Sequence, residues 1–241
     1  MTRYQFVLQV QGAPCLLAVI TLLAGCANTI RPPETETPAE MRTVYLIDFG
    51  RHTRLAFELP DGGLVEYAYG EWRWYAKMED KWWRAPAVML WPTQGTLGRW
   101  RWLEPDAKAR LLDQYDKLIV LELPSEADRV DALVTRLDRD FNRRSGELLR
   151  NTAYRLDFVP YDRRYWLFNN SNHAVKEWLQ ELGYEVRGSG IFAEWKLGSD
   201  EKRCAGWGGR TRSQRASARE IRRAVDSHLV PTSLRDSSNS A

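Results

Sequence analysis

The sequence predicts an α+β domain in which a small antiparallel sheet of about five or six strands packs against helices. Short runs rich in β-branched and aromatic residues occur at 43–49, 54–59 and 64–69, and Pro60-Asp61-Gly62-Gly63 separates the last two, as in a β-hairpin. Two longer segments, 125–144 and 172–182, carry apolar residues at three- and four-residue spacing, which is the period of an amphipathic helix.

The next predicted strand is the run 117–123, Lys-Leu-Ile-Val-Leu-Glu-Leu. We expect Pro124 to end it, because proline cannot donate a backbone hydrogen bond to a neighbouring strand. Ser125 is then the expected N-cap of the first helix, with acidic residues in the turn that follows.

The second helix is expected from about Asn172 to Leu182, with Gly183 as its stop signal. Residues 184–187 and 191–196 predict two closing strands. All these elements fit one domain over residues 43–198, since a chain of about 155 residues suffices for one sizeable core but not comfortably for two.

The N-terminus predicts a lipoprotein signal peptide over residues 1–25. Arg3 is its only charge, and the apolar run 13–25 is shorter than the roughly 20 residues that a membrane span needs. The run closes as Leu-Ala-Gly followed by Cys26, which is the pattern at which lipoproteins are cleaved and acylated. We therefore expect lipidation at Cys26, by palmitate or a similar acyl group, and attachment to a membrane without a spanning helix.

Two flanking segments are expected to lack order. Residues 26–42 read as a flexible linker, because they contain prolines and acidic residues with little apolar content. Residues 199–241 read as a basic, Ser/Arg-rich and mostly disordered tail. The second residue of the mature chain is Ala27 rather than aspartate, which resembles lipoproteins of enteric bacteria that are sorted to the outer membrane. The expected location is thus the bacterial cell envelope, with the domain facing the periplasm.

Charge and cysteine content argue against several classes of function. The formal charge is +3, but the signal contributes one arginine and the tail nine Lys/Arg against five Asp/Glu, which leaves about −2 for residues 27–198. We therefore expect no nucleic-acid partner. Cys15 leaves with the signal and Cys26 is acylated, so Cys204 has no partner for a disulfide, and no Cys/His spacing indicates a metal or other cofactor.

Seven of the eleven tryptophans lie between Trp72 and Trp102. Such a cluster can fill core, or it can form an aromatic surface for a sugar, a lipid or the membrane interface.

The candidate catalytic groups are few. Outside the tail, His52 and His173 are the histidines that could act as acid or base near neutral pH. Ser171 lies at the start of the second predicted helix. There it can be a structural N-cap, or a nucleophile beside helix N–H groups that stabilise an oxyanion. His173 is only two residues away on the same helix and points elsewhere, which leaves His52 as the partner, expected across one cleft from Ser171.

Four segments resemble, in order and spacing, an uncharacterised bacterial family. The family patterns are Val-Tyr-(x3)-His-Gly-x-His-Thr, Glu-Phe-Gly-Trp-Gly-Asp-(x2)-Phe-Tyr, Leu-Trp-Pro-Thr and Leu-Phe-Arg-Thr-Cys-Asn-Thr-Trp, and they match residues 44–53, 66–75, 90–93 and 167–174. That family is similar to circularly permuted NlpC-type, papain-like amidases and peptidases, in which the histidine precedes the cysteine.

The resemblance implies a papain-like fold, with His52 as the base, Glu71 at the acidic position and Ser171 at the position of the cysteine. Phe49 stands where the family has its first histidine, and Glu71 replaces an aspartate. Serine cannot supply the thiolate that papain-like catalysis uses. Together these departures suggest a scaffold that has lost its catalysis or has been given another use.

Three functions follow from these observations. The first is a membrane-anchored lipoprotein with a degenerate papain-like cleft that binds an envelope component, either a peptidoglycan peptide or an acyl group. The second is an active amidase, peptidase or acyltransferase that uses Ser171 and His52, oriented by Glu71 or a nearby amide. The third is a structural lipoprotein that binds a protein partner or the membrane.

Overall fold

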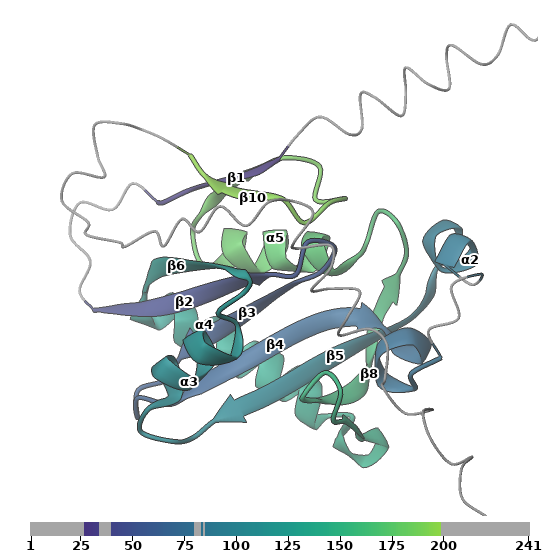
Figure 1. Ribbon diagram of the computed structural model, residues 1–241, viewed down its shortest axis with the longest axis horizontal. Helices are drawn as coiled ribbons and strands as arrows, with labels where there is room; N and C mark the ends of the chain where they lie inside the picture. Colours follow the sequence, from purple (N-terminus) through teal and green to yellow (C-terminus); the bar gives the residue numbers. More distant parts are fainter. Residues whose placement is uncertain (1–26, 34–39, 80–82, 84, 199–241) are drawn as a thin grey trace, which may run out of the picture.

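The computed structural model describes residues 27–33, 40–79, 83 and 85–198. The signal peptide, Cys26 and the tail at 199–241 lie outside these residues. The described chain forms a seven-stranded antiparallel sheet, in the order β6-β2-β3-β4-β5-β8-β7, and a three-stranded sheet, in the order β10-β1-β9 (Figure 1). The α+β class is confirmed, and the main sheet is larger than the five or six strands expected.

The large sheet contains the predicted hairpin. In the turn between β3 and β4, the Leu59 amide donates to the Gly63 carbonyl at 2.9 Å, and Gly62 has a φ of 81°, a conformation that glycine adopts without strain. The strands of this sheet are β2 (Met41–Asp48), β3 (Thr53–Glu58), β4 (Leu64–Glu71), β5 (Thr93–Trp102), β6 (Ile119–Glu126), β7 (Leu149–Asn151) and β8 (Leu156–Tyr165).

Helices cover both faces of the sheet. Both predicted helices, α4 (Ala127–Asn142) and α5 (Ser171–Glu181), pack on one face, and α3 (Ala107–Gln114) packs on the other. The short elements are a π-helix, η1 (Trp72–Ala76), the helix α2 (Ala85–Leu90) and a 3₁₀ turn, η3 (Ser145–Glu147). No helix in the described part of the chain is both long and apolar enough to cross a membrane.

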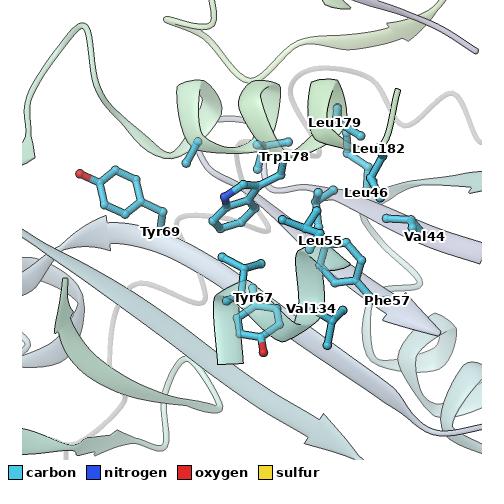
Figure 2. Close-up of a cluster of buried hydrophobic side chains, with 14 of the residues drawn as sticks. Val44, Leu46, Leu55, Phe57, Tyr67, Tyr69, Val134, Trp178, Leu179 and Leu182 are labelled. Carbon is cyan, nitrogen blue, oxygen red and sulfur yellow. The ribbon is translucent and has the colours of Figure 1, made fainter. Parts of the chain in front are cut away.

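The main core lies between the sheet and the pair α4 and α5 (Figure 2). It takes alternate residues of each strand, such as Leu46 on β2 and Tyr67 on β4, because successive side chains point to opposite faces. Trp178 and Leu179 of α5 cover the core on the side away from the sheet, and both are at most 2% exposed. Burial of each large apolar side chain contributes about 1.5–3 kcal/mol, so this layer holds α5 firmly on the sheet.

The junction before α4 differs from the prediction. Strand β6 continues through Pro124 to Glu126, and Ser125 is not an N-cap; its hydroxyl donates to the Leu123 carbonyl at 3.3 Å. Proline is tolerated here because, in the part of the chain that the structure describes, β6 is an edge strand and pairs with β2 alone. The pairing of Met41 with Glu126 extends the strand beyond the expected end.

The expected flexible linker at 26–42 also requires correction. Residues Asn28–Arg31 form β1, which pairs in parallel with β10 (Trp195–Leu197) and antiparallel with β9 (Glu185–Arg187). Ile30 is fully buried. The segment is ordered through backbone pairing with the two closing strands, which its own composition does not reveal. The domain therefore includes residues before 43, and the closing strands are shorter than predicted.

Candidate functional site

The first turn of α5 is capped by Asn170, the residue before Ser171. The Asn170 Oδ1 accepts hydrogen bonds from the amides of Asn172, at 2.9 Å, and of His173, at 3.2 Å. Ser171 is the first residue of the helix, and it is only 2% exposed. The N-cap of α5 is therefore Asn170 and not Ser171, for which the sequence had suggested this structural role. The same amides that could have stabilised an oxyanion are already satisfied.

A buried polar chain fixes this end of α5 to the sheets. The Trp195 indole donates to the Thr53 hydroxyl at 2.8 Å, and that hydroxyl donates to Asn172 Oδ1 at 2.9 Å. Asn172 also donates to the Ile191 carbonyl at 3.4 Å. These contacts join β3, α5 and β10, so the start of α5 is held by groups that satisfy one another.

His52 lies next to Thr53 in the chain but contacts a different cluster. Its ring stacks on Tyr75 with centroids 5.0 Å apart and lies 6.1 Å from the Phe49 ring. Phe49 and Tyr75 pack with the clusters on the sheet face opposite α5, whereas Thr53 bonds to α5. This is the alternation expected of successive residues at the start of a strand. Within the described residues, no hydrogen bond or ring contact joins His52 to Ser171.

The environment of His52 keeps it neutral. Burial lowers the pKa of His52 to about 3, and the nearby Arg54 guanidinium adds to the effect. Its Nδ1 is buried without a hydrogen-bond partner among the described residues. A histidine with so low a pKa is a weak base at neutral pH, so even a rotated ring would activate a serine poorly.

Beneath His52 lies a charged cluster that sequence reasoning did not find. Arg54 Nη1 donates to Glu66 Oε1 at 2.9 Å, and the Tyr115 hydroxyl donates to the same oxygen at 3.0 Å. Arg54 and Glu66 are at most 4% exposed, and the Arg54 guanidinium also lies 4.6 Å from the centre of the Phe49 ring. The signal available in the sequence was the pair of opposite charges at Arg54 and Glu66, in predicted hairpin strands that are otherwise mostly apolar or aromatic.

Glu71 has a structural contact of its own. It ends β4, is 2% exposed, and its Oε2 accepts a hydrogen bond from the Trp74 amide at 2.6 Å, which caps the π-helix η1. Burial, together with the charge of Glu71, raises the pKa of Tyr165 to about 12. Within the described residues, no hydrogen bond connects Glu71 to His52. The expected trio is therefore not assembled as a hydrogen-bonded relay.

Asp48 is an acidic group that the sequence did not single out. It ends β2 on the same face as Leu46, which is the face that α5 covers, and it accepts a hydrogen bond from the Gly50 amide at 2.6 Å. Burial raises the pKa of Asp48 to about 6, although hydrogen bonds from the Gly50 and Trp195 amides oppose the shift. Its signal in the sequence was an aspartate directly before a turn that contains glycine.

No group of three or more His, Cys, Asp or Glu residues in the described chain is arranged to hold a metal ion. A surface hollow between α4 and α5, lined by Asp128, Arg136 and Glu181 among others, lies at the C-terminal end of α5 and so away from Ser171.

We compared the chain with family models, curated proteins and solved structures. No family model matches the chain, and no curated protein or solved structure matches it either. The chain is an α+β protein in which a large antiparallel sheet packs against helices.

Proposed function

We propose that this protein is a lipid-anchored protein of the bacterial cell envelope, whose papain-like scaffold no longer catalyses and instead binds an envelope component near the start of α5. The component is a peptidoglycan peptide or an acyl group. The anchor is Cys26, and the membrane is the outer membrane, with the domain in the periplasm.

One observation carries the non-catalytic part of the proposal. Ser171 stands at the helix start that a papain-like nucleophile would occupy, but His52 packs against Tyr75 on the other face of the sheet. The Asn170 side chain occupies the amides of Asn172 and His173. The base is thus turned away from the serine and two of the helix amides that could face an oxyanion are already bonded, and the loss of a base or of an oxyanion donor lowers activity strongly in enzymes of this kind.

A first experiment tests the anchor. Cells that express the full chain are fed a palmitate analogue, and labelling of wild type is compared with that of Cys26→Ala. We expect label only on wild type, with the wild-type protein in the membrane fraction. Label that survives Cys26→Ala would place the anchor elsewhere and contradict this part of the proposal.

A second experiment tests catalysis. The mature chain is treated with a serine-directed fluorophosphonate, with Ser171→Ala as the matched control. We expect no labelling at Ser171, because no base among the described residues forms a hydrogen bond with its hydroxyl. Labelling of wild type that Ser171→Ala abolishes would overturn the non-catalytic assignment in favour of an active hydrolase or acyltransferase.

A third experiment tests binding. A soluble disaccharide-peptide muropeptide and dodecanoate are each titrated into the isotope-labelled mature chain, and amide shifts are followed by NMR. We expect one of the two to perturb amides at Asn170 to Ala174 and to leave those near Glu181 unchanged. If neither ligand perturbs the start of α5, the binding role fails and a structural lipoprotein takes its place.

A further inference from the structure

Exposed apolar side chains gather around the start of α5. Leu90, Trp91, Phe168 and Phe192 are 62%, 67%, 53% and 55% exposed, although side chains of this kind are usually buried. We call this set, together with the half-buried Trp166, the aromatic rim. Trp166 and Phe168 pack edge to face with ring centroids 5.2 Å apart.

Backbone contacts place the members of the rim together. The Leu167 amide donates to the Met89 carbonyl at 3.0 Å, which holds the segment before α5 against α2 (Figure 1). On the other side of the helix start, Asn170 Nδ2 donates to the Ile191 carbonyl at 3.1 Å. The rim therefore surrounds one end of the domain and is not a set of scattered residues.

The chain enters the domain at the same end. Asn28 is the first residue of β1, and its side chain donates to the Phe192 carbonyl at 2.7 Å, while its amide bonds to the Glu194 carbonyl. Cys26 is only two residues earlier, so its Cα lies at most about 8 Å from that of Asn28. Because β1 is part of the fold, this short connection replaces the long spacer that the sequence suggested.

Acyl chains on Cys26 would therefore enter the bilayer within reach of Phe192. A domain tied so closely cannot stand off the membrane, and the end that carries the rim must face the lipid. Aromatic side chains are favoured at the boundary between headgroups and acyl chains. Arg51 and Arg164 are exposed near the same end of the sheet, and neither has an ion pair among the described residues, so both are available to lipid phosphates.

We infer that the aromatic rim is a membrane-docking surface that inserts Trp91, Phe168 and Phe192 into the interface of the bilayer that holds the anchor. This inference rests on the proposed lipidation of Cys26. It adds that the anchor and the rim act together. The lipid anchor alone holds the domain at one point, and contact of the rim with the bilayer would also fix the orientation of the domain. The start of α5 would then open at the membrane surface.

The test measures depth at single positions. In a Cys204→Ser background, Phe168→Cys and Phe192→Cys are made in the full chain, and the processed, lipidated proteins are labelled with an environment-sensitive fluorophore. They are placed in vesicles of phosphatidylethanolamine and phosphatidylglycerol that contain brominated lipid. Leu103→Cys is the matched control, because Leu103 is 69% exposed but follows the opposite end of β5.

We expect fluorophores at 168 and 192 to be blue-shifted and quenched severalfold more than the one at 103. If the protein floats with the vesicles but all three positions are quenched alike, the docking surface is refuted while the anchor stands. If the chain does not incorporate the palmitate analogue and does not float with the vesicles, Cys26 is not the anchor, and the inference fails together with the proposed lipidation. A blue shift at 168 and 192 that persists without vesicles, with a dimer in sedimentation, would assign the rim to a second copy of the chain and overturn the inference.

Discussion

The strongest prediction about stability concerns the buried pair of Arg54 and Glu66. The change Glu66→Gln keeps the size and most hydrogen-bonding capacity of the side chain but removes its charge. Arg54 would then remain charged at 4% exposure, with the Tyr115 hydroxyl and the Tyr154 carbonyl, each 3.3 Å away, as its other partners. Breaking a buried ion pair from one side costs about 3–5 kcal/mol, because a charge is left without compensation in a poorly polarisable interior.

The assay is urea unfolding of the mature chain, followed by tryptophan fluorescence. With a dependence on urea of about 1–3 kcal/mol per molar, the predicted loss lowers the unfolding midpoint by roughly 2 M. The matched control is Glu122→Gln, since Glu122 pairs with Lys108 at 3.1 Å while both side chains are largely exposed. Such a surface pair contributes about 0–1 kcal/mol.

A double variant separates charge from packing. Arg54→Met with Glu66→Gln removes both charges and should recover about 2 kcal/mol or more of the loss caused by Glu66→Gln alone, because the unpaired cation is gone. If Glu66→Gln costs no more than Glu122→Gln, or if the two changes at the buried pair simply add, the pair is not coupled as its geometry implies.

Four further substitutions test the helix cap, the response to acid and the first strand. Asn170→Ala should lower the free energy of unfolding by about 0.5–2 kcal/mol, because it uncovers two helix amides, whereas Ser171→Ala should cost less; equal losses in thermal unfolding would contradict the assignment of the cap. The pKa of His52 is lowered to about 3, so the unfolded chain binds a proton at higher pH than the folded chain does. The contribution of His52 to the free energy of unfolding is therefore complete above pH 6.5 and is lost as the pH falls towards 3. His52→Gln should reduce this loss when unfolding is measured as a function of pH. Asp48, with a pKa raised to about 6, acts in the opposite sense, since its contribution is present below pH 3.8 and is lost as the pH rises through 6, and Asp48→Asn should therefore steepen the acid response. Ile30→Ala should cost about 2–5 kcal/mol if β1 belongs to the folded core, and a loss close to zero in the same unfolding assay would return it to the linker.

The elements that the sequence predicted well are those specified by nearby residues. The hairpin of β3 and β4 is encoded by its turn, and α4 and α5 by their apolar period, so each could be read from a short window. Strand β1 could not, because its partners β9 and β10 lie more than 150 residues later in the chain. The end of β6 was misjudged because only the position of that strand at the sheet edge makes Pro124 acceptable.

In the candidate site, too, features set by nearby residues were predictable and features set by the fold were not. The helix start at Ser171 was predictable, because capping is a local property. The direction of His52 was not, since one residue more or less in a strand connection changes the face to which a side chain points. The charges of Arg54 and Glu66 were visible, but only the register of the hairpin places them together below His52.

The hydrogen bonding of buried polar groups differs between the two faces of the sheet near Ser171, and this difference bears on the proposed absence of catalysis. On the face of α5, Thr53, Asn172 and Trp195 form a chain in which each donor has an acceptor, so hydrogen bonds within the protein hold the helix start. On the other face, His52 Nδ1 and Arg54 Nε are buried without partners among the described residues. A catalytic pair needs the opposite arrangement, with the base beside the serine and the helix amides open to an oxyanion. On the proposed non-catalytic assignment, a catalytic pair would therefore require the histidine to move to the other face of the sheet, and Ser171→Cys alone would not produce activity.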